Sequence, residues 1–343
     1  MHRRDYEVYG EKEMSKLLIT GAAGFLASHL VDLMLSRGYD VTGVDDLSHG
    51  NVQNLDGALR DSRFHFCQVD VCDMSAMRRC VDKVDTVIHL AAYKIPRYGT
   101  ATKTLLVNSQ GTMNALQLAC EKSAKFVITS TSDVYGKNPN VPFSEDADSV
   151  LGSPTVGRWA YATSKRYDEH LVLAMAEDCG IYTTVLRIFG SYGPRQNLSW
   201  WGGPQSVFID AILRDEVIPI HGDGQQTRSF TFVSDTVRGI AAAAESSNCN
   251  QEIINIGANE EVSILDLASR IYRMCGKSGS PAIKLIPYDE IANRKYEDVR
   301  RRIPDTRKAK ELLNFEAKIP LEQGLLETIA WQRQWITPLV HAD

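Results

Sequence analysis

The sequence predicts an α/β fold built on a doubly wound parallel sheet, with a smaller α/β lobe interleaved toward the C-terminus. Short apolar runs alternate with segments of helical periodicity through the first half of the 343 residues, which is the order that makes a parallel sheet with helices on both faces. The first strand leads through a glycine-rich turn directly into a helix. From Gly190 the strict alternation lapses, and no Gly- or Ser-rich linker separates the C-terminal part of the chain from the first half.

The glycine turn joins a strand at 17–19 to a helix expected from Phe25 to Gly38. Gly21 allows the tight turn, Gly24 lets the backbone approach a phosphate, and Ala27 takes the position where helix packs on strand. Unpaired N–H groups and the positive end of the helix dipole meet there, which suits a pyrophosphate. Taken alone, the turn is equally compatible with an ordinary strand–helix connection.

A carboxylate after the second strand, 41–44, favours the dinucleotide interpretation. Asp45 stands where an acidic residue binds the adenosine ribose hydroxyls. No arginine lies between Asp46 and Val52 to accept a 2′-phosphate, so NAD is favoured over NADP. The sequence therefore predicts a Rossmann-type domain whose first NAD contacts are Gly21, Ala23, Gly24, Phe25, Leu26 and Asp45.

Three further strands, expected at 64–69, 86–90 and 126–129, end at the same edge of the sheet. Asp70, just after the first of these strands, is well placed to contact the edge of the adenine ring. It could equally cap the start of the helix expected at 74–81. Small residues after the second would let the cofactor lie against the backbone. The side-chain amide of Asn108, early in the helix expected at 104–123, could hydrogen-bond a neighbouring loop and hold it in place. The NAD contacts added here are Asp70, Val71, Leu90, Ala91, Ala92 and Asn108.

The rest of the chain divides into a return to the main sheet and a second lobe. We expect a helix at 161–179, a strand at 183–188, an irregular covering loop at 191–205, a helix at 206–213, a strand at 217–221, a helix at 234–244, a strand at 253–256 that rejoins the main sheet, and mostly helix from Glu260. The predicted NAD-binding domain is 15–189 plus about 229–257, the second lobe is about 190–228 plus 258–343, and 1–14 form an N-terminal extension.

Tyr161 and Lys165 lie four residues apart at the start of one predicted helix, so their side chains share a face. An ammonium beside a phenol favours the phenolate, which lowers the pKa of the tyrosine and makes it usable as a general base. The YxxxK pattern alone often occurs by chance. Here the dinucleotide turn and the hydroxyl-rich segment 130–136 support it.

Together these motifs resemble the extended short-chain dehydrogenases/reductases that act on nucleotide sugars as epimerases, dehydratases and decarboxylases. The matching segments, in the family's order, are TGAAGFLASH (20–29), Asp45, HLAA (89–92), Asn108, STSDVYG (130–136), YATSK (161–165), RIFGSYGPR (187–195), GDGQQTRSF (222–230) and RRIPD (301–305). They cover nearly the whole chain after Met14. The resemblance implies an NAD that is held tightly and recycled in each turnover.

The resemblance also implies roles for individual residues. Tyr161 would take the proton of the sugar 4-OH as C4 is oxidised to a ketone, and Lys165 would hold the nicotinamide ribose. Thr131 matches a hydroxyl that bonds O4. Arg228 and one of Arg301 or Arg302, in the last two motifs, match positions that bind the diphosphate of the substrate. The alternative is that these arginines form a solvated basic surface. The predicted substrate-binding residues are Thr131, Arg195, Gln205, Arg228, Arg301 and Arg302.

The residues after Thr131 bear on the fate of the ketone. In this family, dehydratases carry Asp-Glu in the slots of Ser132 and Asp133, whereas decarboxylases carry Ser-Glu, so Asp133 is one methylene shorter than the decarboxylase residue. Gly190 stands where many members place an Asn that contacts the substrate. The leading hypothesis is a nucleotide-sugar 4-epimerase, an isomerase of UDP-sugar type. The alternative is a UDP-glucuronate-type decarboxylase or a dehydratase using Ser132 and Asp133, and a third is a non-catalytic sensor of NAD and nucleotide sugar.

Two further expectations concern the covering loop and the oligomer. Trp200 and Trp201 suit stacking on a sugar or base, or burial under a lid. The amphipathic helices at 104–123 and 161–179 resemble those that form a four-helix dimer interface in this family, so a homodimer is expected.

Composition excludes several classes of partner. A formal net charge of −5 argues against non-specific nucleic-acid binding, and no apolar run approaches the length of a membrane span. Residues 1–13 are too polar for a signal peptide, so a soluble, cytoplasmic protein is expected. The 8 histidines show no ligand-like clustering and predict no metal site. The 7 cysteines contain no CxxC pair and are expected to be reduced.

Overall fold

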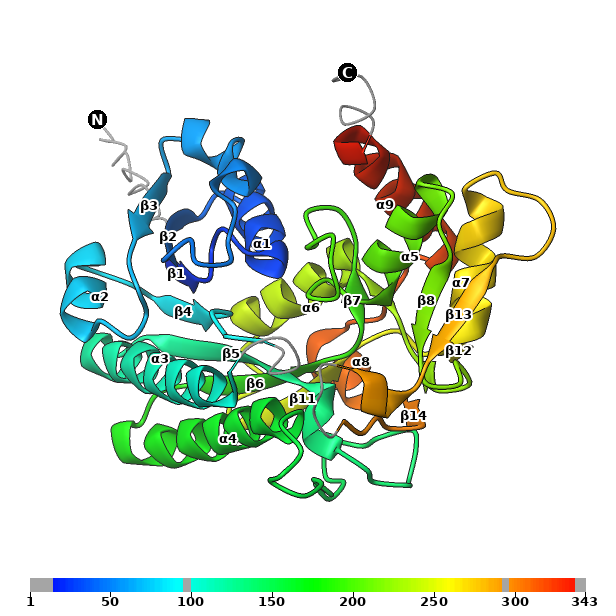
Figure 1. The fold of residues 1–343 in the computed structure, drawn as a ribbon. Coiled ribbons are helices and arrows are strands. Elements are labelled where there is room, and N and C mark those ends of the chain that lie inside the picture. Colours follow the sequence, from blue (N-terminus) through cyan, green and yellow to red (C-terminus); the bar gives the residue numbers. More distant parts are fainter. Residues whose placement is uncertain (1–14, 95–99, 292–295, 337–343) are drawn as a thin grey trace, which may run out of the picture.

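The central sheet of the computed structural model has seven parallel strands, as the sequence predicts (Figure 1). The structure describes residues 15–94, 100–291 and 296–336, so the extension 1–14 lies outside it. The strands, in the order β3-β2-β1-β4-β5-β6-β11, are Phe64–Gln68, Asp40–Asp45, Lys16–Thr20, Thr86–His89, Lys125–Thr131, Thr183–Ile188 and Glu252–Ile256. The strand order reverses between β1 and β4, and a doubly wound sheet binds ligands in the crevice at such a reversal.

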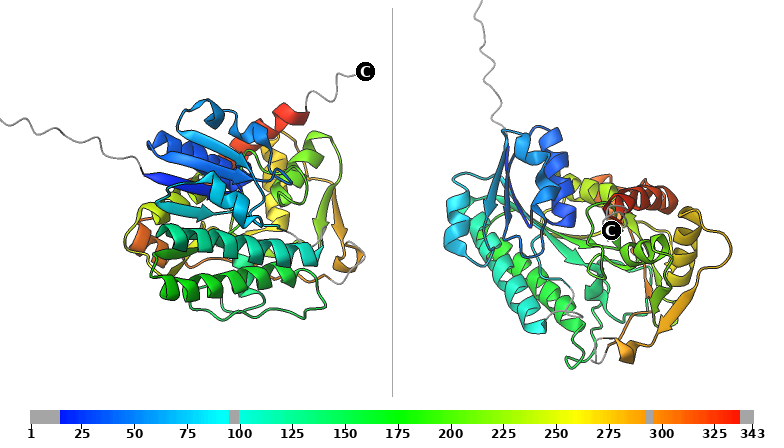
Figure 2. Two further views of the ribbon diagram at one scale, coloured as in Figure 1. Left: turned by 90° about the vertical axis from the view of Figure 1, so that its left-hand side faces the viewer. Right: turned by 45° about the horizontal axis from the view of Figure 1, so that its top comes forward.

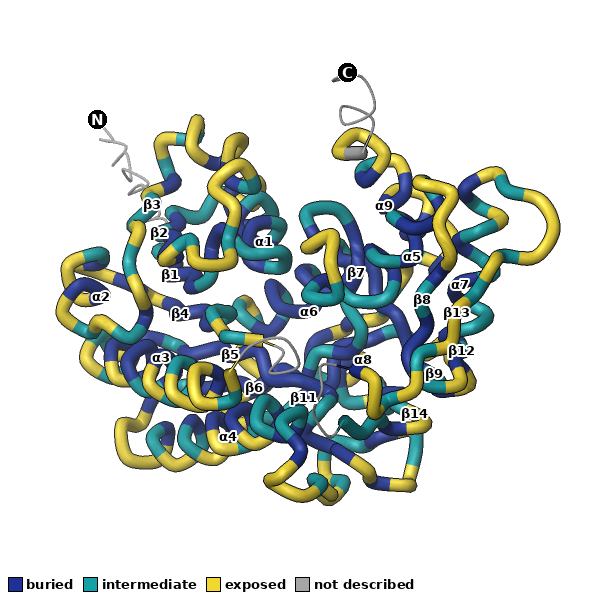
Figure 3. Tube along the Cα trace, viewed as in Figure 1, coloured by how far each residue is buried: buried dark blue, intermediate teal, exposed yellow. Residues whose placement is uncertain are grey.

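Helices cover both faces of this sheet (Figure 2). On one face lie α1 (Phe25–Ser36) and α6 (Val233–Glu245), and on the other lie α2 (Met74–Cys80), α3 (Ala101–Lys122) and α4 (Trp159–Cys179). Adjacent β1 residues divide between the faces, because Leu17 and Ile19 belong to the first core and Leu18 to the second. The inner strands are therefore buried along their length (Figure 3), which explains their continuous apolar runs, whereas the edge strand β3 alternates between buried and exposed residues.

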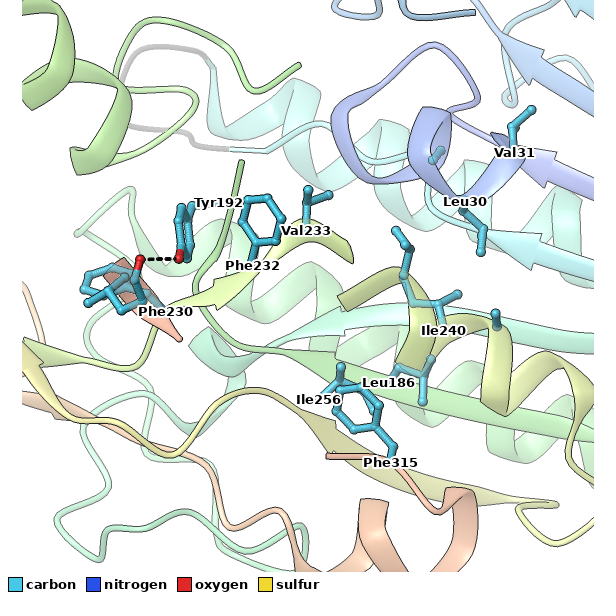
Figure 4. Close-up of a cluster of buried hydrophobic side chains, with 14 of the residues drawn as sticks. Leu30, Val31, Leu186, Tyr192, Phe230, Phe232, Val233, Ile240, Ile256 and Phe315 are labelled. Atoms are coloured by element: carbon cyan, nitrogen blue, oxygen red, sulfur yellow. Dashed lines mark hydrogen bonds between the residues drawn. The ribbon is translucent and has the colours of Figure 1, made fainter. Parts of the chain in front are cut away.

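The first core continues from the sheet into the second lobe (Figure 4). Leu30 of α1 and Ile240 of α6 belong to it, and so do Tyr192 and Phe232. The rings of Tyr192 and Phe232 meet edge to face with centroids 5.7 Å apart. Because one core joins both parts, the second lobe is held firmly against the sheet edge where the strands end.

The second lobe contains more strand than the sequence indicates. Its helices are α5 (Pro204–Leu213), α7 (Ile264–Met274), α8 (Arg307–Leu313) and α9 (Leu321–Ile336), and its strands are β7 (Ser191–Tyr192), β8 (Ile218–His221), β9 (Thr227–Arg228), β12 (Val262–Ser263), β13 (Ile283–Ile286) and β14 (Arg301–Arg302). β10 (Thr231–Phe232), in the segment predicted to return to the first domain, pairs with β7. The expectation of mostly helix after Glu260 is wrong for β12, β13 and β14. These short strands exist through distant partners, since β13 pairs with β8 and β14 with β9. The predicted domain boundaries stay a prediction.

The cysteines also depart from expectation at one pair. Cys120 near the end of α3 and Cys179 at the end of α4 form a disulfide, with their Cα atoms 5.8 Å apart. The other five are free. A separation of 59 residues gives no sign of this pair, because only the packing of α3 against α4 brings the two side chains together. Within the described residues, none of the helices is both long and apolar enough to cross a membrane.

Candidate active site

A cleft of about 900 Å³ extends from the glycine turn, across the ends of the strands, into the second lobe. Most of the predicted cofactor residues line it: Gly21, Ala23, Gly24, Phe25, Leu26, Asp45, Asp70, Val71, Leu90, Ala91 and Ala92. The catalytic candidates Thr131, Ser132, Asp133, Tyr161 and Lys165 line it too, as do the substrate candidates Arg195, Gln205, Arg228 and Arg302. The structure thus brings together residues from nearly the whole length of the described chain.

The turn at the start of α1 has the geometry that a pyrophosphate requires. Gly21 has φ +72°, and a Cβ there would lie 3.0 Å from the backbone of Ala91, so glycine is needed for both reasons. α1 begins after Gly24 with no side-chain cap. Its first N–H groups and the positive end of its dipole are therefore available to an anion.

Asp45 at the end of β2 is a buried carboxylate held by the backbone. It accepts hydrogen bonds from the N–H groups of Ala23 at 3.0 Å and Leu47 at 2.8 Å. Burial raises the pKa of Asp45 despite these bonds. A Cβ on Gly50 would lie 2.7 Å from its Oδ1, so glycine leaves room beside the carboxylate. The carboxylate retains acceptor capacity for ribose hydroxyls, and these residues therefore fit NAD.

Asn108 is the exception among the predicted cofactor contacts, because it lies outside the cleft lining. Its side chain accepts from the N–H of Tyr93 at 2.7 Å and donates to the carbonyl of Tyr93 at 3.3 Å and to Ser164 Oγ at 3.0 Å. Since Ser164 precedes Lys165, Asn108 joins the segment after β4 to the start of α4. It therefore supports the site, as its expected role in tying down a loop implies, without lining it.

The electrostatics around Tyr161 differ from the expectation of a lowered pKa. Burial raises the pKa of Tyr161, and the charges of Asp133 and Asp168 raise it further, while a hydrogen bond from Thr131 lowers it. The ammonium of Lys165 lies 3.5 Å from Asp168 on the same helix. The lysine charge is therefore partly offset by a neighbouring carboxylate, which the sequence pattern did not reveal.

Asp133 belongs to a network of three guanidinium groups and two carboxylates. Its Oδ1 accepts from Arg158 at 3.0 Å and from Arg302, while Asp298 pairs with Arg158 at 2.5 Å and with Arg228 at 2.7 Å. Burial alone would raise the pKa of Asp133, but Arg302 and Arg158 outweigh it, and the pKa is lowered. Asp133 is therefore an anion at neutral pH.

The two candidate arginines of β14 point in different directions. Arg302 lines the cleft and pairs with Asp133, whereas Arg301 bonds Glu261 at 2.7 Å and keeps 54% of its side chain exposed. Successive side chains of a strand lie on opposite faces, so only one of the two can reach the cleft. The structure does not place Arg301 at the site.

Polar groups without protein partners lie where the cleft enters the second lobe. Arg195 has φ +66° and pairs with Asp32 at 2.8 Å, yet its buried Nη1 has no hydrogen-bond partner in the described part of the chain. The same holds for Gln205 Nε2 and Gln226 Oε1. Buried groups of this kind suit a polar ligand.

The tryptophan loop lies over the cleft. Trp201 stacks on His49 with ring centroids 4.8 Å apart and meets Tyr93 edge to face at 5.6 Å. Trp200 stacks on His221 at 4.0 Å. Both tryptophans are thus engaged with protein rings, which agrees with the lid interpretation more closely than with a free stacking platform.

Among the cleft residues that sequence reasoning missed are Lys94, Arg158 and Asp298. Lys94 follows the small residues after β4, and this position is the one feature of the sequence that could have identified it as a cleft residue. Burial lowers the pKa of Lys94, the charge of Asp133 raises it, and the charge of Arg302 lowers it further. Lys94 therefore interacts electrostatically with both residues. Arg158 and Asp298 belong to segments that show no motif, and only the fold brings them together.

A sequence model of the family described as GDP-mannose 4,6 dehydratase matches residues 18–328. The chain is an extended short-chain dehydrogenase/reductase. Enzymes of this family are NAD-dependent, and the glycine turn and Asp45 of this reductase-family member fit that cofactor.

Relatives of this extended reductase-family enzyme process UDP-sugars. It is 37% identical to a UDP-N-acetyl-alpha-D-glucosaminuronate decarboxylase of Bacillus cytotoxicus, over 93% of this chain and 98% of that one. It is 35% identical to UDP-glucuronic acid decarboxylase 1 of Xenopus tropicalis, over 94% of this chain and 73% of that one. Its structure is similar to UDP-glucuronic acid 4-epimerase from Bacillus cereus in complex with UDP-glucuronic acid and NAD, with TM-score 0.82, 31% identity, and coverage of 93% and 99%.

Proposed function

We propose that this enzyme is an NAD-dependent decarboxylase of a UDP-linked hexuronic acid. The observation that carries the proposal is the anionic Asp133 lining the same cleft as Tyr161 and Thr131. Its slot is the one in which the family's decarboxylases carry Glu, and the missing methylene does not remove it from the cleft. The two relatives named as decarboxylases support the same conclusion. The 4-epimerase favoured by the sequence becomes the second candidate.

The charge of the cleft supports an acidic sugar. Among the described residues, Lys94 and the guanidinium groups of Arg158, Arg228 and Arg302 lie around the two carboxylates of Asp133 and Asp298, so this part of the cleft has two more positive than negative charges. A diphosphate and a sugar carboxylate would both use this surplus. We assign the sugar carboxylate to Lys94 and Arg302, because both interact electrostatically with Asp133.

The first chemical step needs a base at the sugar O4. Tyr161 would take this proton as phenolate, and the Thr131 hydroxyl, which bonds Tyr161, would hold O4 in line. Lys165 would bind the nicotinamide ribose. Bound NAD supplies the hydride acceptor for C4 and returns the hydride at the end of the cycle.

Oxidation at C4 makes the C6 carboxylate that of a β-keto acid. The C5–C6 bond then breaks, CO2 leaves, and the electron pair moves through C5 onto O4, where the hydroxyls of Tyr161 and Thr131 stabilise the charge. A proton from solvent replaces CO2 on C5. Because its pKa is lowered, Asp133 would act as a fixed negative charge that repels the substrate carboxylate and holds Arg302, and not as a proton donor.

Incubation with UDP-glucuronate and with its 2-acetamido analogue tests the proposal. We expect CO2 release and a UDP-pentose lighter by one CO2 in mass spectrometry. Tyr161→Phe should abolish turnover, with a loss of about 100-fold or more. A product of unchanged mass with inverted C4 would reject decarboxylation, and retention of function in Tyr161→Phe would favour the sensor hypothesis.

One observation favours 4-epimerisation as the second candidate. Both guanidinium groups converge on the same oxygen of Asp133, so its charge is partly neutralised and would repel a substrate carboxylate less. An epimerase would keep the carboxylate, let the 4-keto sugar turn, and return hydride to the other face. The structural neighbour from Bacillus cereus is named for that reaction on a uronic acid.

We also propose that the enzyme is a homodimer through α3 and α4, and that it is cytoplasmic. Leu106 of α3 is 63% exposed, and Leu105 of α3 and Tyr167 of α4 are exposed as well. These apolar side chains lie on the two helices that the family resemblance assigns to the interface. A second copy would remove them from water.

A further inference from the structure

A buried charge pair lies directly behind the catalytic tyrosine. Asp168 and Lys165, one turn apart on α4, are 0% and 1% exposed. The ammonium lies 3.5 Å from Asp168 Oδ2. Neither carboxylate oxygen has a hydrogen-bond partner within the described ranges, and the same is true of Lys165 Nζ and of Thr112 Oγ1 on the adjoining α3.

The neighbouring Glu169 shows what a structural ion pair looks like on this helix. Its carboxylate accepts from Arg187 Nε and Nη2, both at 2.9 Å, and from Ser130 Oγ at 2.6 Å. Glu169 is therefore fully satisfied in its buried site. Asp168, equally buried, has the 3.5 Å contact with Lys165 and the neighbouring hydroxyl of Thr112, and a buried carboxylate with so little compensation costs stability. Packing therefore does not account for an aspartate at this position.

We infer that Asp168 is a positioning residue of the active site, whose buried negative charge holds the side chain of Lys165 in place beside Tyr161 and sets the strength of that tyrosine as a base. The inference rests on the roles proposed above for Tyr161 and Lys165. Asp168 does not line the cleft, so it acts through Lys165 and not on the substrate.

The charged groups around the pair are few, which makes the effect of Asp168 separable. Asp133 of the segment after β5 and Arg302 of β14 also act on Tyr161, with opposite signs. On the β4 side, burial lowers the pKa of His89 to about 3, so this imidazole is neutral at working pH. Around Asp168 itself, burial raises its pKa. Lys165 and the hydroxyl of Thr112 oppose this shift, and the charge of Glu169 adds to it.

Removing a negative charge makes every neighbouring proton easier to lose. Tyr161 would therefore become phenolate at lower pH, which moves the acidic limb of the rate profile down. A merely structural role would reduce the rate and leave this limb where it is.

The test compares the pH dependence of kcat for the wild type, Asp168→Asn and the matched control Asp178→Asn, which changes an exposed aspartate of the same helix. We expect the acidic limb of Asp168→Asn to move to lower pH by about one unit, and the control to match the wild type. An acidic limb that stays in place, with or without a loss of rate, would overturn the inference, because it would show a neutral or uncoupled carboxyl. If Asp168→Asn does not fold, Asp168→Ser removes the same charge and carries the same expectation.

A second readout does not depend on turnover. In protein labelled with ¹³Cζ-tyrosine, the Tyr161 signal is assigned by its loss in Tyr161→Phe. At the highest pH that preserves the fold, a larger ionised fraction is expected in Asp168→Asn than in the wild type, and equal fractions would reject the inference. Since this measurement needs no substrate, it separates failure of the inference from failure of the proposed reaction.

Discussion

Tyr161 lies among the carboxylates of Asp133 and Asp168, the ammonium of Lys165 and the guanidinium of Arg302, and the balance of these charges sets its reactivity. Burial, Asp133 and Asp168 all raise the pKa of Tyr161. The pattern of a lysine four residues after a tyrosine predicts a lowered tyrosine pKa, because it identifies the neighbouring lysine but not the carboxylates that packing brings close. At the scale of single residues, therefore, the sign of a pKa shift depends on side chains that the local sequence does not reveal.

Asp133→Asn tests the reaction type. We expect CO2 release to fall about 100-fold, because the fixed charge that repels the substrate carboxylate and holds Arg302 is lost. Oxidation at C4, followed as NADH absorbance in a single turnover, should persist. Asp146→Asn, an exposed aspartate in the following loop, is the matched control. Unchanged CO2 release would show that Asp133 has no part in this step.

Lys94→Met tests recognition of the sugar carboxylate. The methionine keeps the apolar stem and removes the charge, so KM for the UDP-hexuronate should rise about 30-fold, equivalent to about 2 kcal/mol. Binding of the neutral UDP-hexose, measured by calorimetry, should hardly change. Lys310→Met, which alters an exposed lysine paired with Glu316, should leave both values unchanged. An equal loss for both sugars would contradict the assignment.

At the scale of elements, β14 presents its two arginines to opposite sides. Arg302→Ala should lower kcat/KM by about 100-fold, since it removes the guanidinium between Asp133 and the proposed sugar carboxylate. Arg301→Ala should stay within about twofold, because its partner Glu261 lies away from the cleft and surface pairs contribute little. Steady-state kinetics on this pair of variants check the strand register directly. Equal losses would mean that β14 is turned differently.

The segment just before β14 contributes to stability through Asp298, which joins Arg158 and Arg228. Burial alone would raise the pKa of Asp298, but Arg228 and Arg158 outweigh it and lower the pKa far below its usual range. This stabilisation is fully present above the unfolded pKa, near about 4, and is lost as pH falls through the depressed folded value. Asp298→Asn should therefore cost about 3 kcal/mol at neutral pH.

Urea unfolding at several pH values checks this prediction. The difference between wild type and Asp298→Asn should be constant from neutral pH down to about pH 4 and should shrink below it. A difference that grows on acidification would contradict the ion-pair origin.

At the scale of the whole molecule, exposed apolar side chains on α3 indicate a partner surface. Leu106→Asp places a charge in the proposed interface and should convert the dimer to monomer at micromolar concentration, measured by light scattering. Leu59→Asp, which changes another exposed leucine outside α3 and α4, is the control. A wild-type protein that is monomeric under these conditions would rule out the proposed homodimer.

The sheet could be predicted almost completely from the chain. Its inner strands are buried on both faces and appear as short apolar runs, while the edge strand β3 appears as an alternating one. The polar and small residues that line the cleft come directly after these strands. Asp45, Ala91 and Thr131 are found in this way, because parallel strands all end at the same edge. Short strands such as β13 leave no comparable pattern, since they depend on a partner about 65 residues away that supplies their hydrogen bonds.

The sequence by itself determined the family, the glycine turn for NAD and the pair Tyr161 and Lys165, because each depends on spacing within one strand, turn or helix. Only the tertiary structure decided that Arg302 and not Arg301 reaches the cleft, that Asn108 supports the site from outside, and that Cys120 meets Cys179. It also placed Asp168 behind Lys165 in a buried site, and brought Asp298 to Arg158. Charge interactions act through space and not along the chain, so their balance at Tyr161 exists only once distant segments have packed together.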